Sequence, residues 1–187
     1  PCPRQLRDEV HPYGRPNLSE AEYRKLASAN MLYAFCAKVI HWCLDHNVLF
    51  LLENPARSWM WAIPEVAGLM MRQGVAEVVF SQCMQSDATP LRDKRTTCVT
   101  NCNELLTLGS LCDGKHMHAD WGVKCQDGVW DFDTAEHKKF PRLLSRRIAR
   151  IVCKRLRIDN RLPRSEDLAK QRTANEWRKE ALGKQPR

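Results

Sequence analysis

The stretch FLLENPARSWMW, residues 50–61, is the part of the sequence that decides the predicted fold. The apolar run Val48–Leu52 is short and bounded by polar residues, which is typical of a strand covered on both faces. Pro55 disfavours continued pairing, so we expect this strand to end at Glu53-Asn54-Pro55. Glu53 would then be held rigidly at one edge of a sheet. The alternative is that Glu53 merely caps the following turn.

The elements around this strand alternate between helices and strands. Ser19 is a candidate N-cap, and Glu22 completes a capping-box pattern for a helix that runs to about Asp45. Helices and strands alternating in this way predict half of an α/β sheet flanked by helices. Ligands in such sheets bind beyond the carboxyl ends of the strands. The other expected elements are a helix at 64–71, strands at 75–80 and 96–100, helical turns at 103–108, a long loop at 112–133, and helices at 134–156 and 165–182.

Length and composition predict one globular domain without a membrane span. The chain has 187 residues, of which 43% are hydrophobic, and its longest apolar run, Val48–Leu52, is far shorter than the roughly 20 residues that cross a bilayer. We expect an irregular lead-in at 1–18, an α/β body at 19–157 and a basic helical tail at 158–187. Nine cysteines without a CxxC pair favour reduced thiols in an intracellular protein, nuclear or cytoplasmic. Because the chain begins with Pro1 rather than Met, we expect a fragment.

The positive charge lies at the C-terminal end. Residues 138–187 hold 17 Lys and Arg against 5 Asp and Glu, although the whole chain carries a net charge of only +8. Four basic residues there, Arg142, Arg146, Arg150 and Lys154, recur every four residues and predict one basic stripe on a helix. Such a stripe could follow a phosphate backbone, which makes DNA the expected partner. The alternative is the solvated face of an amphipathic helix.

Several segments together resemble one protein family. FLLENP followed by ARSWMW is similar to the ENV/ENP motif of C5-cytosine DNA methyltransferases, and more narrowly to a divergent group with an ENPxxSxxW pattern. The resemblance covers roughly residues 4–155. The other segments that carry it are RQLR at 4–7 with HPYG at 11–14, VVFSQCM at 78–84, KRT at 94–96, CDGKHMH at 112–118, DTAE at 133–136 and FPRLL at 140–144.

The resemblance implies a reaction in which a cysteine thiolate attacks a flipped cytosine, and the base then takes the methyl group of S-adenosylmethionine. It implies that Glu53, with Asn54 and Pro55, holds the cytosine edge. It also implies that three residues, Lys94, Arg95 and Thr96, contact DNA phosphate or support the surroundings of the thiolate.

This sequence departs from the family pattern in two places. It has no FxGxG loop for the cofactor, and Pro1-Cys2 is the only trace of the loop with the catalytic cysteine. The resemblance therefore implies a partial Rossmann-like sheet of the class I methyltransferase type, flanked by helices. We expect it to be the C-terminal part of such a domain, with its cofactor-binding half missing and its own activity open. Two alternatives remain. One is a non-enzymatic, basic nucleic-acid-binding module of a larger or mobile-element-derived protein, stabilised by zinc; the other is a remnant without a biochemical role.

A second group of residues suggests a metal. Cys112, His116 and His118 are types that bind zinc, whose structural sites have four nitrogen or sulfur ligands. Cys102 or Cys125 could supply the fourth ligand. The alternative is a loop with solvated histidines and a buried thiol.

Overall fold

The computed structural model describes residues 5–86, 91–119, 122–126, 129–132 and 140–158. The chain divides into two compact units, Pro1–Ile151 and Val152–Arg187. All the elements below belong to the first unit, except for the last turns of the C-terminal helix. No helix in these ranges is long and apolar enough to cross a membrane.

The first helix, α1 (Glu20–Asp45), agrees with the prediction. The Ser19 hydroxyl accepts from the backbone N–H of Glu22, and the Glu22 carboxylate accepts from the backbone N–H of Ser19. This capping box satisfies two N–H groups that the first turn leaves without partners. The predicted helix at 64–71 is also present, as α2 (Pro64–Met70), with its proline in the first turn. A short 3-10 helix, η1 (Trp59–Ala62), precedes it.

The sheet contradicts the Rossmann-like prediction. It has three strands, β1 (Leu51–Pro55), β2 (Ala76–Ser81) and β3 (Arg95–Thr100). Their order is β1-β3-β2, and β3 pairs antiparallel with both neighbours. The prediction was wrong because an apolar run shows that a strand is buried but not which way its neighbour runs. The strand ends at Pro55, as expected, but it begins at Leu51, and Glu53, Asn54 and Pro55 lie within it, paired with Cys98, Thr97 and Thr96.

The antiparallel β3 brings three chain segments to one edge of the sheet. Because β1 and β2 both run opposite to β3, they run in the same direction as each other. Their carboxyl ends, Pro55 and Ser81, therefore lie beside the first residues of β3. Two backbone hydrogen bonds continue this edge, from Ala56 N–H to the Arg95 carbonyl at 3.0 Å and from Gln82 N–H to the Lys94 carbonyl at 2.9 Å. The rule used to predict a ligand site applies to open α/β sheets and therefore does not carry over to this antiparallel sheet.

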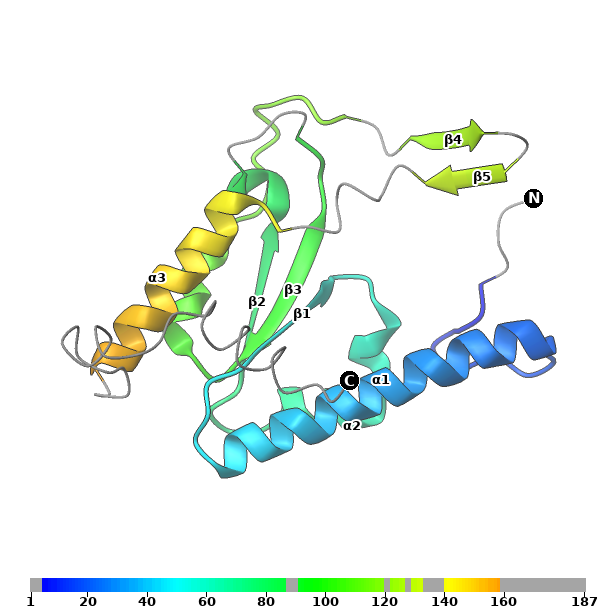
Figure 1. Ribbon diagram of the computed structural model, residues 1–187, viewed down its shortest axis with the longest axis horizontal. Helices are drawn as coiled ribbons and strands as arrows, with labels where there is room; N and C mark the ends of the chain where they lie inside the picture. Colours follow the sequence, from blue (N-terminus) through cyan, green and yellow to red (C-terminus); the bar gives the residue numbers. More distant parts are fainter. Residues whose placement is uncertain (1–4, 87–90, 120–121, 127–128, 133–139, 159–187) are drawn as a thin grey trace, which may run out of the picture. The chain divides into compact units, whose positions relative to one another are not determined.

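Two apolar layers lie against the sheet. In one, α1 and α2, which run close together (Figure 1), pack around a cluster that Leu52 of β1 joins. In the other, a 3-10 helix, η3 (Asn103–Leu108), contacts β2, and its Leu105 and Leu108 are fully buried. Burying apolar side chains in both layers contributes most of the stability, at roughly 25 cal/mol per Å² of apolar surface. The cluster of the first layer consists of Ala37, Ile40, Met60, Ile63, Val66 and Leu69.

The remaining elements follow the sheet. A 3-10 turn, η2 (Gln82–Gln85), comes directly after β2. The predicted loop at 112–133 contains a two-stranded antiparallel hairpin, β4 (Val123–Gln126) and β5 (Val129–Phe132). The last helix, α3 (Arg142–Ile158), confirms a helix in this region, although its predicted start at Thr134 lies outside the described residues. The helix predicted at 165–182 lies outside them as well.

Candidate metal centre and adjoining cationic cavity

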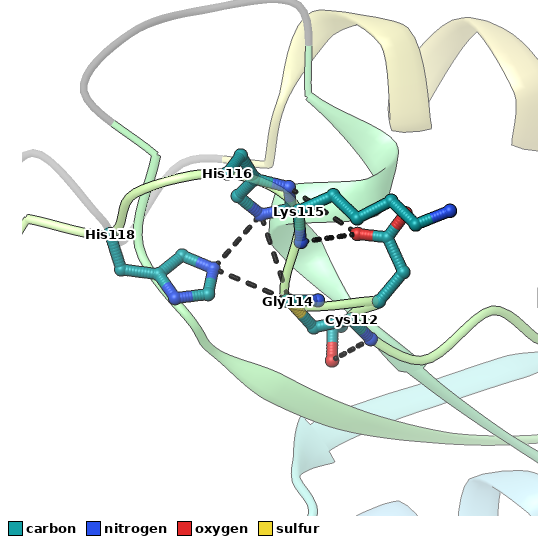
Figure 2. A network of polar contacts seen from close by, with 7 residues as sticks. Cys112, Gly114, Lys115, His116 and His118 are labelled. Atoms are coloured by element: carbon teal, nitrogen blue, oxygen red, sulfur yellow. Dashed lines mark hydrogen bonds and ion pairs between the residues drawn. The ribbon is translucent and has the colours of Figure 1, made fainter.

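Four potential metal ligands meet beside the end of β2. The ligand atoms of Cys83, Cys112, His116 and His118 all lie within 4.8 Å of one another. Cys83 sits in η2, and the other three come from the segment that follows η3. Figure 2 shows both histidine rings turned toward the Cys112 sulfur. The prediction of Cys112, His116 and His118 as one set of ligands is therefore confirmed as a geometric cluster that could hold a metal ion.

The distances within the cluster suit a tetrahedral ion. Cys112 Sγ lies 3.7 Å from His116 Nε2 and 3.5 Å from His118 Nε2. Zn–S bonds of about 2.3 Å and Zn–N bonds of about 2.0–2.1 Å imply S–N edges of roughly 3.5–3.6 Å in a tetrahedron. The two Nε2 atoms are 2.9 Å apart, somewhat closer than the roughly 3.3 Å that the same bond lengths imply. A small outward movement of one ring would accommodate the ion.

The local backbone explains how Cys112 and His116 come together. Gly114 has φ +69°, a left-handed conformation that glycine adopts without strain. This turn directs the Gly114 N–H to Cys112 Sγ at 3.4 Å. Asp113 Oδ1 lies 3.7 Å from His116 Nδ1 (Figure 2). A carboxylate behind a ligating histidine orients the ring and favours coordination through its other nitrogen.

Cys83 is the ligand that the sequence analysis missed. The two predicted alternatives do not take its place: the Cys102 thiol is buried and lies 3.3 Å from Glu104 Oε2, and the side chain of Cys125 lies outside the described residues. The feature of the sequence that could have identified Cys83 was its position just after a predicted strand. What brings it to the loop is Ser81, whose N–H donates to the Ser110 carbonyl at 2.9 Å and whose hydroxyl accepts from Cys112 N–H at 3.1 Å.

Burial, and then the neighbouring Cys112, raise the pKa of the Cys83 thiol to about 11. Without a metal this thiol is protonated at neutral pH, so a metal ion that binds it must displace the proton.

A cationic cavity lies at the same edge of the sheet. It has a volume of about 550 Å³ and is lined by Pro55, Ala56, Arg57, Asp93, Lys94 and Arg95. Three of these six residues carry a positive charge and one a negative charge, so the cavity favours an anion. It lies at the carboxyl end of β1.

Glu53 lies next to this cavity, because its carboxyl group is beside Lys94, one of the lining residues. Its Oε1 atom is buried and lacks a hydrogen-bond partner among the described residues, and the nearest ammonium, Lys94 Nζ, is 3.9 Å away. The two side chains are 21% and 23% exposed. Burial raises the pKa of Glu53, and Lys94 opposes this shift without cancelling it. Burial thus shifts the carboxyl group of Glu53 toward its protonated form.

The structure places the other predicted site residues in different surroundings. Asn54 contacts the sulfur of the buried Met60 at 2.9 Å. Thr96 is fully buried and accepts from Gln82 Nε2 at 3.2 Å. The thiol paired with Glu53 across the sheet belongs to Cys98, whose pKa is raised to about 12 by burial and then by Glu53, so it is not a nucleophile. Cys2 lies outside the described residues.

The basic stripe of α3 is solvent-exposed. Arg142, Arg146 and Arg150 are all exposed, and so is Lys154 at the next position of the repeat. The intervening Leu144 is fully buried. Arg147, outside the stripe, has a different role: it donates to Gln85 Oε1 next to η2 and to the Thr107 carbonyl at 3.4 Å.

Comparison of the chain with protein-family models, with curated proteins and with solved structures finds no match.

The raised pKa of Glu53 predicts a pH-dependent effect of Glu53→Gln on stability. Because the pKa of Glu53 is higher in the folded chain than in the unfolded chain, its protonated form contributes to stability at low pH. This contribution is fully present below pH about 4.5, the ordinary value for a glutamate, and is lost as the pH rises through the folded pKa. Glutamine carries no charge at any pH. The free energy of unfolding of the variant, measured in urea, should therefore improve relative to the original chain between pH 4 and pH 7.

Glu77→Gln, at an exposed position on β2, the other outer strand of the sheet, is the control for loss of a surface carboxylate. If the two variants change in parallel from pH 4 to pH 7, burial does not control the ionisation of Glu53.

Proposed function

We propose that this chain is a zinc-stabilised nucleic-acid-binding module. The observation that carries the proposal is the four-ligand cluster of Cys83, Cys112, His116 and His118 at the sheet edge that also forms the cationic cavity. The cluster supplies the stabilising ion, and the cavity together with the exposed α3 stripe supplies positive charge for a polyanion.

Zinc is the ion that this donor set fits best. Two thiolates and two imidazoles form one of the standard structural zinc sets, whereas calcium and magnesium require oxygen ligands. Four protein ligands complete the tetrahedron and leave no position for water or substrate. The ion would therefore have a structural role rather than a catalytic one.

Zinc at this position would stabilise the cationic edge. It would tie Cys83, in the turn after β2, to the loop at 112–118, which the sheet otherwise holds mainly through Ser81. Gln82, next to Cys83, holds the Lys94 carbonyl through its N–H and Thr96 through its side chain. Ordering this turn therefore orders the start of β3, from which Lys94 and Arg95 project.

A nucleic-acid phosphate backbone fits the distribution of positive charge. Lys94, Arg57 and Arg95 line one concave site, while Arg142, Arg146 and Arg150 form an exposed row on α3. Phosphate contacts of this kind provide affinity and register without reading sequence.

Zinc content tests the first half of the proposal. Metal analysis of the purified chain should find about one zinc per chain, since a site with four N and S ligands holds one ion. Cys83→Ser and His116→Ala should each lower zinc content and the melting temperature, whereas Cys153→Ser, at an exposed cysteine outside the cluster, should leave both unchanged. A zinc-free chain, or a Cys83→Ser variant that keeps full zinc, contradicts the site.

Salt dependence tests the second half. Affinity for a short DNA duplex should fall as salt rises, and each phosphate contact removed should reduce the slope of log K against log salt by about 0.9. We expect Arg95→Ala and Arg142→Ala to show this reduction, and Lys25→Ala, an exposed cation on α1, to leave the slope unchanged. Chelating the zinc should weaken binding. An affinity that does not change with salt contradicts the proposed contacts. So does a Lys25→Ala variant that reduces the slope as much as Arg95→Ala and Arg142→Ala do.

A second candidate function rests on Glu53. The resemblance to C5-cytosine methyltransferases implies that this glutamate holds a cytosine. The raised pKa of Glu53 supports that role, as does its Oε1 atom, which has no hydrogen-bond partner among the described residues, because a protonated carboxyl can donate to cytosine N3 and accept from the N4 amino group. The chain would then be the base-recognition part of a methyltransferase-like site. The S-adenosylmethionine site and the nucleophilic cysteine would have to come from elsewhere, since no glycine-rich loop is present in this sequence.

Nucleotide discrimination tests this second candidate. Cytidine monophosphate should bind more tightly than thymidine monophosphate, by roughly tenfold, because the proposed role holds the O–H of Glu53 toward position 3 of the ring, where thymine carries an N–H. Glu53→Ala should remove the difference, and Glu53→Gln, which keeps one donor and one acceptor, should preserve part of it. Arg57→Ala, at another cation of the same cavity, should weaken both nucleotides equally. Equal affinity for the two nucleotides in the original chain contradicts base recognition by Glu53.

A further inference from the structure

The long helix α1 has one face that the fold does not cover. Its buried face consists of Leu26, Ala37, Ile40 and Cys43. Another face carries large apolar side chains that remain substantially exposed. We call this set the α1 stripe: Met31 (68%), Leu32 (57%), Phe35 (62%), Val39 (40%) and Trp42 (54%).

The spacing shows that the α1 stripe is one continuous surface. Met31, Phe35, Val39 and Trp42 follow one another at intervals of three or four residues, which keeps them on one side of a helix. The exposed Ser28 continues the same row one turn earlier, so the row from Ser28 to Trp42 is roughly 20 Å long at 1.5 Å per residue.

The apolar character of the α1 stripe is unusual for a solvated surface. A solvated helix normally presents polar residues on the face away from the core. Here the helix instead presents five large apolar side chains, and the cation Lys38 is exposed between Phe35 and Val39. A surface of this kind indicates a binding site for another apolar surface.

The area of the α1 stripe is large enough for a modest interface. Large side chains offer on the order of 150–250 Å² each when fully accessible, so the five exposed fractions sum to roughly 500 Å². This equals the largest apolar patch of a typical monomer, which is often functional. Burying the stripe on two copies, with the aliphatic stems of the flanking basic residues, removes about 1,000–1,200 Å² in total. Specific complexes begin near this value.

We propose that the α1 stripe binds the same surface of a second copy of this chain, with the two helices antiparallel. A two-fold axis near Phe35 places that residue beside its counterpart and Met31 of each copy beside Val39 of the other. The same axis places Trp42 of each copy opposite Ser28 of the other, so that a large side chain meets a small one. Self-complementary pairing through a single patch is the usual form of a symmetric dimer.

The charges at the two ends of the stripe favour this direction. Antiparallel helices bring Arg24 of one copy close to Asp45 of the other, and symmetry forms the pair twice. Within one chain Arg24 pairs with Glu20, at 2.9 Å and with both side chains highly exposed, so Arg24 can exchange partners at little cost. A parallel arrangement would place Asp45 beside Asp45 and Trp42 beside Trp42.

The Trp42 side chain is held in place within the single chain, before any partner binds. Its ring stacks on His46 with centroids 4.4 Å apart and an interplanar angle of 21°, and His46 Nδ1 lies 2.8 Å from the Trp42 carbonyl oxygen. An aromatic side chain held before binding loses little conformational entropy on association, and buried tryptophans are frequent interface hot spots. The dimer does not depend on the proposed zinc or nucleic-acid sites.

Sedimentation equilibrium across about 1–200 µM tests the proposal, because an interface at the lower size limit of specific complexes favours a weak dimer that depends on concentration. The mass should rise to that of a dimer. Phe35→Glu should raise the dissociation constant at least about 30-fold, as expected for the loss of a central anchor. Met71→Glu, at a methionine that is 87% exposed outside α1, should leave the dimer intact. Circular dichroism would confirm that each variant folds.

Charge exchange tests the antiparallel alignment. Arg24→Glu should weaken the dimer, and adding Asp45→Arg in the same chain should restore it, because the pair is then reversed rather than broken. A monomer at 200 µM, or a dimer that survives Phe35→Glu, overturns the proposal. Failure of the double variant to recover affinity overturns the antiparallel arrangement.

Discussion

The antiparallel pairing of β3 between β1 and β2 is the constraint on which the rest of the structure depends. Because β3 runs against both neighbours, the ends of β1 and β2 and the start of β3 share one edge. Three segments far apart in the sequence meet there: Glu53 to Arg57, Ser81 to Cys83, and Lys94 to Arg95. Without this pairing the cationic cavity and Cys83, a potential ligand, would not lie at the same edge of the sheet. Both candidate functions therefore depend on one strand register.

The metal cluster and the cavity are coupled through a few backbone contacts. Ser81 binds the loop that carries Cys112, and Gln82 binds the strand that carries Lys94. A single short turn thus joins the two sites, and order in one is transmitted to the other by ordinary hydrogen bonds. The buried Gln85 extends this support to η3 and α3, since it donates to the Leu108 carbonyl at 2.9 Å and accepts from Arg147.

Local patterns were the part of the fold that could be predicted. The capping box at Ser19 and Glu22 marked the start of α1, Pro64 marked the start of α2, and the β-branched run near Val78 and Val79 marked β2. In each case the signal lies within a few residues of the element that it specifies. The stripe at Arg142, Arg146 and Arg150 also followed from helical spacing alone. The strand direction could not be read in this way, because apolar residues suit a parallel and an antiparallel neighbour equally.

The amino-acid sequence by itself determined which side chains are available: the ligands Cys112, His116 and His118, the carboxyl of Glu53, the basic residues at 94–95, and the helices that present one apolar or one basic face. Tertiary structure alone decided how these meet. It supplied Cys83 as the fourth potential ligand, it buried Glu53 and so raised its pKa, and it left one side of α1 uncovered. The physical reason is that burial, desolvation and coordination depend on neighbours distant in sequence, and the register of β3 chooses those neighbours.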